Sequence, residues 1–424
     1  MSPKKSSADW PLPFAEPEEV GISSKRLAQI RPGLQKFIDK QMVPNLVTLV
    51  ARHGKIVHFE AQGYMDFDSK KPATKETIYR LWSNTKPITG TATMICVEEG
   101  LLNLDDPISK YIPAFKNQVV RVEAGSGPMI GTPTVPVARD ITVRDCLRNT
   151  TGLTTARRAP LTYLTEFSDI LPKSGVLISP ERPSGSIREM VEALAKLPLE
   201  SQPGTRFEYQ VGYPVVGTVL EIVTGKTLEE FYQERIFRPL GMKDTSFYLP
   251  KSKLDRFPTL YRPVREGGGW KLSVAEVPEK SEKVTGPKTY FEAGGGAGGV
   301  LSTAADYARF AQMLLNGGEL EGTRIISRKM VELMTRSHTG DVPLSIPGPG
   351  FGFGMGVGVY LGGGIPIIRS VGTYGWGGAA GTTYFANPKE DLVCVCFTQV
   401  FMHMVMPGNT YQEEFERLVY QSLL

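Results

Sequence analysis

Strand patterns lie near both ends of this chain of 424 residues, whereas its long middle carries mainly helices and loops. Residues 46–51 and 55–61 are rich in β-branched and apolar side chains and are separated by a short turn, which predicts a hairpin. Near the other end, a further strand pattern at residues 381–386 precedes residues 392–397, an unbroken apolar run typical of a buried strand. Both ends are therefore expected to contribute strands to one sheet.

Apolar residues at helical spacing mark several amphipathic helices. These helices are expected around residues 27–38, 88–96, 215–223, 303–315 and 411–419. Pro- and Gly-rich loops alternate with helical patterns in the middle of the chain. We therefore predict a sheet domain built from residues 1–105 and 285–424, and an inserted, mainly helical domain formed by residues 106–284.

The composition excludes several classes of function. Forty-eight basic and 44 acidic residues give a net charge of only +4, which does not indicate a nucleic-acid or membrane-surface partner. No apolar stretch resembles a signal peptide or is long enough to span a bilayer, so we expect a cytoplasmic protein. The four cysteines show no zinc-binding spacing and are expected to be free, buried thiols: Cys96, Cys146, Cys394 and Cys396.

Ser83 and Lys86 are the candidate residues for nucleophilic chemistry. The chain has four histidines and no G-x-S-x-G pattern, so a serine nucleophile would need a base other than the usual histidine. Residues three apart share one face of a helix, which brings Lys86 next to Ser83. Pro87 is tolerated only in the first turn of a helix, so the helix should begin near Ser83 or Asn84. The Ser83 hydroxyl would then lie where free N–H groups favour a developing oxyanion.

Lys86 can act as a base only if its pKa falls. An ordinary lysine has a pKa of about 10.4, and lowering it by roughly 3 units costs on the order of 4 kcal/mol. A helix dipole supplies only about 0.3–1 kcal/mol, whereas burial can shift a pKa by about 3–5 units. The hypothesis therefore requires that Lys86 be buried, or that it share its proton with a second group.

Five segments together resemble the superfamily of class C β-lactamases, DD-peptidases and family VIII carboxylesterases. They are residues 81–89 (LWSNTKPIT), 99–113 (EGLLNLDDPISKYIP), 140–153 (DITVRDCLRNTTGL), 237–247 (FRPLGMKDTSF) and 298–306 (GGVLSTAAD). The resemblance runs from about Val20 to the C-terminus. It implies an α/β (α+β) fold of the β-lactamase/DD-peptidase type, with an antiparallel sheet flanked by helices and an inserted, mainly helical domain.

The resemblance assigns Tyr209 to the second catalytic element of this superfamily. Residues 203–211 (PGTRFEYQV) place Tyr209 in the position of the tyrosine of the Y-x-N motif, and they match better there than on the neighbouring Tyr213. A phenol held beside Lys86 could exist as phenolate or share its proton, and so act as a base toward Ser83 and later toward water. Val211 replaces the asparagine that helps bind the lactam side chain, which favours ester substrates.

Trp376, Gly377 and Gly378 are similar to the W-G-G motif of family VIII esterases, which replaces K-T-G. The glycine at 378 is expected to let substrate approach the backbone, and the N–H of Ala379 would complete the oxyanion hole with that of Ser83. Trp376 in place of lysine removes a cation that would hold a carboxylate. Residues 337–340 (SHTG) are similar in sequence to K-T-G but have no strand pattern, and we interpret them as an exposed loop.

The resemblance implies a serine carboxylesterase that hydrolyses short-to-medium acyl esters through an acyl-enzyme on Ser83, with no metal or cofactor, and it allows a weak β-lactamase activity beside this. Its expected partner is a small-molecule ester, and the oligomeric state is left open. Three alternatives remain: a β-lactamase or DD-peptidase, an acyltransferase, and a catalytically inactive binding protein on the same fold. The sequence offers no role for Asn149, where the family usually has histidine.

Overall fold

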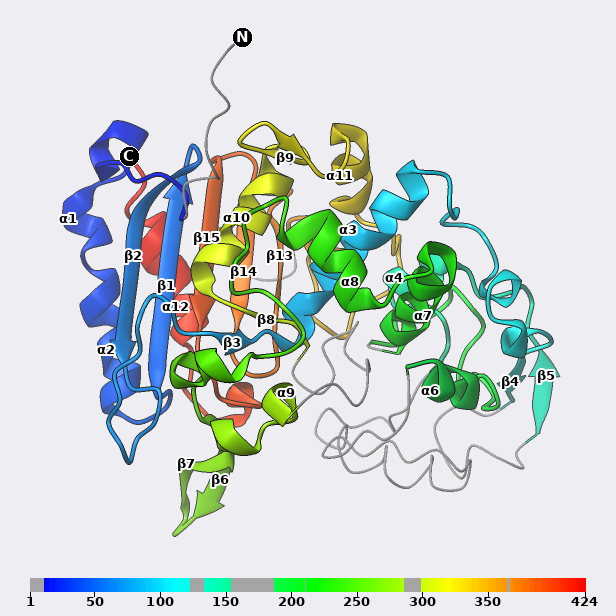
Figure 1. Ribbon diagram of the computed structural model, residues 1–424, viewed down its shortest axis with the longest axis horizontal. Coiled ribbons are helices and arrows are strands. Elements are labelled where there is room, and N and C mark those ends of the chain that lie inside the picture. The colour runs from blue at the N-terminus through cyan, green and yellow to red at the C-terminus, as the bar shows by residue number, and fades with distance from the viewer. Residues whose placement is uncertain (1–10, 123–132, 154–186, 210, 286–298, 364–366) are drawn as a thin grey trace.

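A seven-stranded antiparallel sheet joins the two ends of the chain, as the computed structural model shows for residues 11–122, 133–153, 187–209, 211–285, 299–363 and 367–424 (Figure 1). Its strands follow the order β11-β12-β13-β14-β15-β1-β2. Their bounds are β1 (Asn45–Arg52), β2 (Lys55–Gly63), β11 (Phe351–Phe353), β12 (Gly358–Tyr360), β13 (Tyr374–Gly377), β14 (Thr383–Asn387) and β15 (Leu392–Phe397). The N-terminal hairpin therefore pairs with the buried C-terminal strand, which confirms the predicted sheet.

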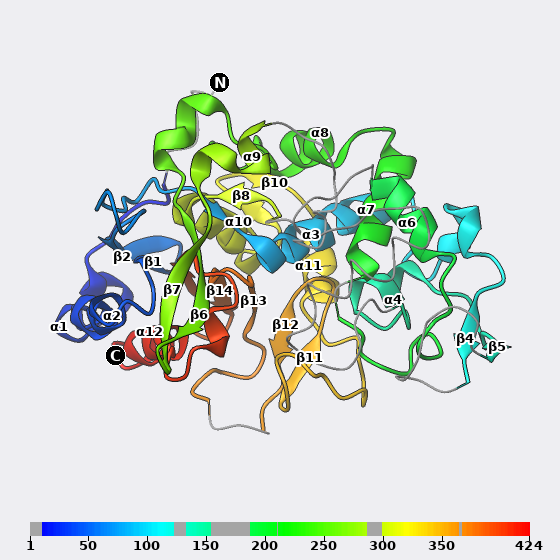
Figure 2. The ribbon, with the colours of Figure 1, turned by 90° about the horizontal axis from the view of Figure 1, so that it is seen from below.

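Helices cover both faces of this sheet (Figures 1 and 2). One face carries α1 (Ser24–Leu27), α2 (Ile30–Asp39) and α12 (Tyr411–Tyr420), and the other carries α10 (Ala304–Leu315). The alternation of side chains along β15 sends Cys394 and Cys396 to the α2–α12 face. All four cysteines are buried and unpaired, as expected.

The long helix α3 (Thr85–Glu98) lies between the sheet and a second group of helices (Figure 1). That group includes α4 (Val143–Leu147), α6 (Ile187–Leu194), α7 (Gly212–Thr224) and α8 (Leu228–Tyr232), with a small hairpin of β4 (Val119–Arg121) and β5 (Thr134–Pro136). Every residue of α3 from Thr85 to Cys96 is buried. A helix surrounded on all sides provides a rigid support for side chains at its N-terminus.

The segment predicted to be mainly helical also contains a long hairpin of β6 (Leu260–Glu266) and β7 (Gly269–Glu276). This hairpin projects from the body of the protein, and its base contacts residues 399–401 beyond β15 (Figure 1). The remaining short elements are β3 (Tyr79–Arg80), β8 (Leu301–Ser302), β9 (Glu319–Leu320), β10 (Thr323–Arg324), α9 (Glu282–Thr285) and α11 (Arg328–Met334). Within the described ranges, no helix has both the length and the apolar character needed to span a bilayer. The domain boundaries stay a prediction.

Candidate active site

Ser83 lies in the short 3₁₀ helix η2 (Trp82–Asn84), which continues directly into α3. The regular helix thus begins one or two residues later than predicted, but Ser83 still precedes its first turn. The segment is fixed on both sides: Leu81 donates its N–H to Val300 O, and the Tyr307 hydroxyl donates to Asn84 O. Only 8% of the Ser83 surface is exposed, so its hydroxyl has a defined and largely dry environment.

Lys86 is fully buried and points back along the helix to Ser83. Its Nζ donates a hydrogen bond of 3.0 Å to Ser83 Oγ, as the spacing of the two residues predicted. Burial lowers the pKa of Lys86 well below its ordinary value of 10.5. The surroundings are aromatic, since Nζ lies 4.5 Å from the centre of the Tyr209 ring and 5.2 Å from that of Tyr213. Lys86 is therefore buried, as its predicted role as a base requires.

Tyr209 precedes α7 and reaches the same point from the other group of helices. Trp376 Nε1, on β13, donates a hydrogen bond of 2.8 Å to the Tyr209 hydroxyl. Burial raises the pKa of Tyr209 above its ordinary value of 10, although hydrogen bonds with Ser83 and Trp376 act in the opposite direction. The environment therefore favours a neutral phenol over the phenolate considered from the sequence. Tyr213 is engaged elsewhere, because its hydroxyl donates to Leu147 O at 2.7 Å.

Gly378 follows β13 and packs directly against the residues before the candidate nucleophile. A Cβ atom at this position would lie 2.2 Å from Leu81 O and 2.3 Å from Thr382 Oγ1. Thr382 Oγ1 also donates to Leu81 O at 2.8 Å. The close packing against Leu81 and Thr382 is by itself a reason for glycine at this position, and the role of Gly378 in substrate approach stays a prediction.

Ala379 lies in the turn after Gly378, which packs against the backbone of Leu81, two residues before Ser83. Its carbonyl accepts a hydrogen bond of 2.7 Å from Met402 N–H, which holds the peptide in place. Gly377, the residue between Trp376 and Gly378, is exposed. The N–H groups of Ser83 and Ala379 are the donor pair that the sequence predicts for an oxyanion, and this assignment stays a prediction.

A family model described as Beta-lactamase matches residues 31–412, which is most of the chain. The protein belongs to the beta-lactamase family. Its relatives include protein Rv1367c of Mycobacterium tuberculosis, which is 31% identical over 92% of this chain and 97% of its own length. Esterase EstB of Burkholderia gladioli is 29% identical over 83% of this chain and 85% of its own length.

A solved structure, described as EstCE1, a hydrolase with promiscuous acyltransferase activity, has the same fold as this family member. Its TM-score is 0.74 at 26% sequence identity, and the match covers 93% of this chain and 99% of the other. The β-lactamase/DD-peptidase type of fold expected from the sequence is therefore confirmed.

In this member of the beta-lactamase family, Asn149 supports the tyrosine segment through its backbone. Asn149 is buried and adopts a left-handed conformation with φ of 60°, which asparagine tolerates better than most residues. Its carbonyl accepts a hydrogen bond of 2.7 Å from the N–H of Glu208, the neighbour of Tyr209. Sequence reasoning found no role for Asn149, because a backbone bond across about sixty residues leaves no local pattern.

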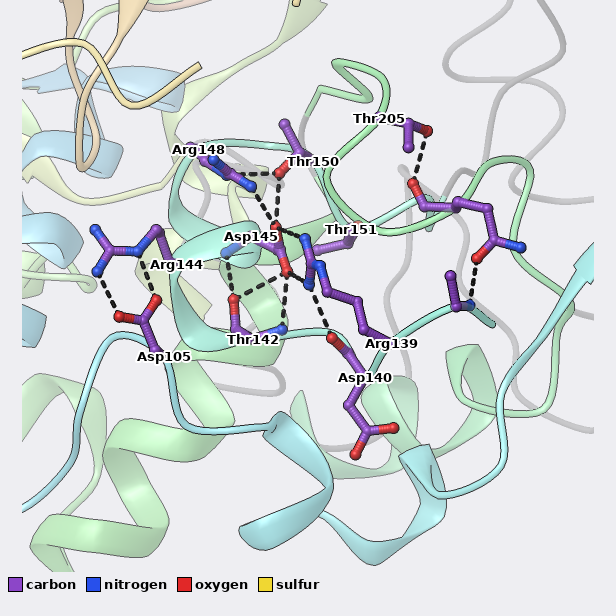
Figure 3. Close-up of polar contacts among 12 residues, drawn as sticks. Asp105, Arg139, Asp140, Thr142, Arg144, Asp145, Arg148, Thr150, Thr151 and Thr205 are labelled. Atoms are coloured by element: carbon purple, nitrogen blue, oxygen red, sulfur yellow. Dashed lines mark hydrogen bonds and ion pairs between the residues drawn. The ribbon is translucent and has the colours of Figure 1, made fainter. Parts of the chain in front are cut away.

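The buried carboxylate of Asp145 holds the loop that leads to Asn149 (Figure 3). It accepts hydrogen bonds from Arg139, Arg148 and the hydroxyl of Thr150, and it closes a capping box with Thr142 at the start of α4. Burial alone would raise the pKa of Asp145, but these donors outweigh it and lower the pKa to about 2. The carboxylate stays charged at neutral pH and keeps this support rigid.

The segment 337–340 is a loop, as expected, but it is not an exposed one. Thr339 is buried, and the His338 ring lies between Leu333 O at 2.7 Å and the Arg144 guanidinium at 3.2 Å. These contacts tie the segment to α4, so its polar residues are structural. The sequence also contains a glycine-rich run at residues 294–299 (GGGAGG), of which only Gly299 lies within the described residues. That part of the chain contains no group of three or more His, Cys, Asp or Glu side chains able to hold a metal ion.

Proposed function

We propose that this protein is a serine carboxylesterase that hydrolyses neutral esters of short-to-medium acyl chains through an acyl-enzyme on Ser83. The observation that carries the proposal is the 3.0 Å hydrogen bond between Lys86 Nζ and Ser83 Oγ, made by a lysine that is fully buried. Burial favours the neutral amine, which can accept a proton. A buried serine–amine pair of this kind has the arrangement of an activated nucleophile and its base.

In the proposed first step, Ser83 Oγ attacks the ester carbonyl carbon and its proton passes to Lys86 Nζ. The carbonyl oxygen gains the negative charge and is stabilised by the N–H groups of Ser83 and Ala379. One donor of this type is worth roughly 3–4 kcal/mol in the transition state. The bond to the alcohol oxygen then breaks and leaves the acyl group on Ser83.

Tyr209 supplies the proton for the leaving alcohol in this scheme. Its raised pKa keeps the phenol protonated at neutral pH, and its hydrogen bond with Ser83 places the hydroxyl beside the reacting atoms. The phenol donates its proton to the alkoxide and regains one from the Lys86 ammonium. In deacylation, water attacks the acyl carbon, its proton passes through Tyr209 to Lys86, and Lys86 returns a proton to Ser83 Oγ as the carboxylic acid leaves.

Two departures from the β-lactamase pattern favour esters over lactams. Val211, in place of an amide-bearing asparagine, is buried and apolar. Trp376, in place of a lysine, donates to Tyr209 and provides no positive charge for a substrate carboxylate. The names of Esterase EstB and of EstCE1 agree with ester hydrolysis, and that of EstCE1 also supports acyl transfer to an alcohol as a second activity.

Three assays test the proposal. A fluorophosphonate should label the wild-type protein and not Ser83→Ala, and equal labelling of both would exclude Ser83 as the nucleophile. Rates on p-nitrophenyl butyrate and nitrocefin should differ strongly in favour of the ester, whereas faster nitrocefin turnover would indicate a β-lactamase. Addition of an alcohol acceptor tests for transesterified product. If the wild-type protein neither becomes labelled nor hydrolyses any ester, it is an inactive binding protein.

A further inference from the structure

The segment that follows β15, residues 398–406 (TQVFMHMVM), is unusually apolar and lies beside the Ala379 turn. Phe401 and Met402 are partly exposed, and Met404, in the 3₁₀ helix η10 (His403–Val405), is 56% exposed. Its one titratable residue, His403, is buried, and burial lowers its pKa to about 4. This surface is therefore uncharged at neutral pH. The mechanism described above uses none of these side chains.

Hydrogen bonds on both sides hold this segment rigidly. Val400 N–H donates to Ala380 O at 2.8 Å, and Met402 N–H donates to Ala379 O at 2.7 Å. On the opposite side, Phe401 N–H donates to Tyr261 O at the base of the β6–β7 hairpin. The backbone on each side of Phe401 is thus bonded to the turn that carries the proposed oxyanion donor. A contact surface built on such a fixed backbone is preorganised for a ligand.

Gln399, within this segment, anchors it to β3, the strand that precedes Ser83. Its Oε1 accepts hydrogen bonds from the backbone N–H and the guanidinium of Arg80, at 2.9 and 3.1 Å. Arg80 is itself buried, and its guanidinium lies 3.8 Å from the centre of the Phe257 ring. Hydrogen bonds between Gln399 and Arg80 therefore join the apolar segment to the chain three residues before Ser83.

Trp82, which immediately precedes Ser83, packs against Phe401 with its ring tilted. The two rings lie 4.7 Å apart with an angle of 33° between their planes. Both side chains are partly exposed, in contrast to the aromatic cluster of Tyr307 and Phe397 in the core, which is fully buried. A tilted aromatic pair that solvent still reaches, one residue from the nucleophile, offers an apolar surface to a bound molecule.

We propose that Trp82 and Phe401 form a subsite that binds an uncharged alkyl or aryl group of the ester substrate. This inference rests on the proposed function, because Trp82 adjoins Ser83 and the Phe401 segment is bonded to the Ala379 turn. Aromatic side chains bind apolar groups and provide no charge that would pair with an anionic one. The apolar group can belong to the acyl or the alcohol part of the ester, and the experiment separates these two sources.

The test compares wild type with Phe401→Ala and Phe401→Leu on two series of esters. In the first series p-nitrophenol is constant and the acyl group grows from acetyl to octanoyl. In the second series the acetyl group is constant and the alcohol changes from ethanol to 1-naphthol. Phe401→Ala should lower the preference for the larger ester, measured as a ratio of kcat/KM values, by about tenfold in one series, and Phe401→Leu should restore part of it. The affected series identifies which part of the substrate binds there.

Trp270→Ala is the matched control, because Trp270 is also a partly exposed tryptophan but lies on β7 near the hairpin turn. It should leave both ratios unchanged. Unchanged ratios in Phe401→Ala, with a melting temperature close to that of wild type, would overturn the subsite. So would an equal loss on all esters, since that result indicates a general role in holding the Ala379 turn. If wild type hydrolyses no ester, the proposed function fails instead.

Discussion

Trp376 and Tyr209 are joined by a hydrogen bond of 2.8 Å from the indole Nε1 to the phenol oxygen, across the boundary between β13 and the segment before α7. An indole N–H can only donate, so the Tyr209 oxygen accepts this bond and the phenol keeps its own proton as a donor, beside Ser83 with which it is hydrogen-bonded. The tryptophan that distinguishes W-G-G from K-T-G therefore orients the proposed proton donor.

Removal of this bond should reduce the chemical step without unfolding the protein. Trp376→Phe keeps an aromatic ring and loses the donor, which is worth roughly 0.5–1.5 kcal/mol, so we expect kcat on p-nitrophenyl butyrate to fall by up to about tenfold. The measurement is steady-state kinetics together with a thermal melt. Trp270→Phe, on the exposed hairpin, should have wild-type kcat, and a wild-type kcat in Trp376→Phe would remove this positioning role.

The two tyrosines near Lys86 should differ in kcat when their hydroxyl groups are lost. Tyr209→Phe removes the proposed proton donor and the acceptor of the Trp376 N–H, so we expect kcat to fall by well over tenfold and stability to fall by about 1 kcal/mol. Tyr213→Phe removes a buried hydrogen bond to Leu147 O and should cost about 1 kcal/mol of stability while kcat stays near wild type. Urea unfolding and steady-state kinetics on both variants check this pair, and exchanged outcomes would reassign the catalytic tyrosine.

Local patterns predicted the parts of the fold and site that local sequence encodes. The hairpin of β1 and β2 and the run of β15 bury a continuous apolar face, so their periodicity is strong. The contact of Lys86 with Ser83 follows from helical spacing alone. The hairpin of β6 and β7 was missed because most of its side chains are exposed, so no apolar face marks it.

Long-range contacts account for what the sequence could not reveal. Trp376 and Tyr209 are 167 residues apart, and no spacing rule connects them. The backbone hydrogen bond from Glu208 N–H to Asn149 O leaves no sequence pattern for the same reason. Desolvation also depends on the assembled core, so the sequence could require burial of Lys86 but could not establish the neutral state of Tyr209.

The pH dependence of kcat/KM should follow the neutral form of Lys86. Because burial lowers the pKa of Lys86, the amine is available as a base far below pH 10.5, and activity should be lost only as the pH falls through this lowered pKa. The raised pKa of Tyr209 keeps the phenol protonated, so no alkaline loss is expected up to about pH 9. A profile on a stable ester between pH 5 and 9 tests this, and an activity that still climbs steadily up to pH 9 would indicate a solvated lysine.

Two buried histidines should make the fold sensitive to mild acid. Burial lowers the pKa of His58 and His403 from 6.5 to about 4. Between these values the unfolded chain binds protons that the folded chain excludes, so stability falls as the pH drops from about 6.5 toward 4. Each histidine should cost on the order of 2 kcal/mol by pH 5. Urea unfolding of wild type and of His58→Gln/His403→Gln at pH 7.5 and 5 measures this, and equal losses in both proteins would exclude the histidines as its cause.

Gly378→Ala should impair the proposed oxyanion site by displacing it. A Cβ at this position would meet Leu81 O at 2.2 Å, so the turn that carries Ala379 must move away from the Ser83 segment. A misplaced oxyanion donor costs roughly 10²–10³ in kcat, and we expect a loss approaching this range with a modest drop in melting temperature. Gly269→Ala is the control, because the nearest atom to its new Cβ is 3.9 Å away. If Gly378→Ala retained wild-type kcat, the Ala379 N–H would not be an oxyanion donor, since the backbone clash cannot be relieved without moving it.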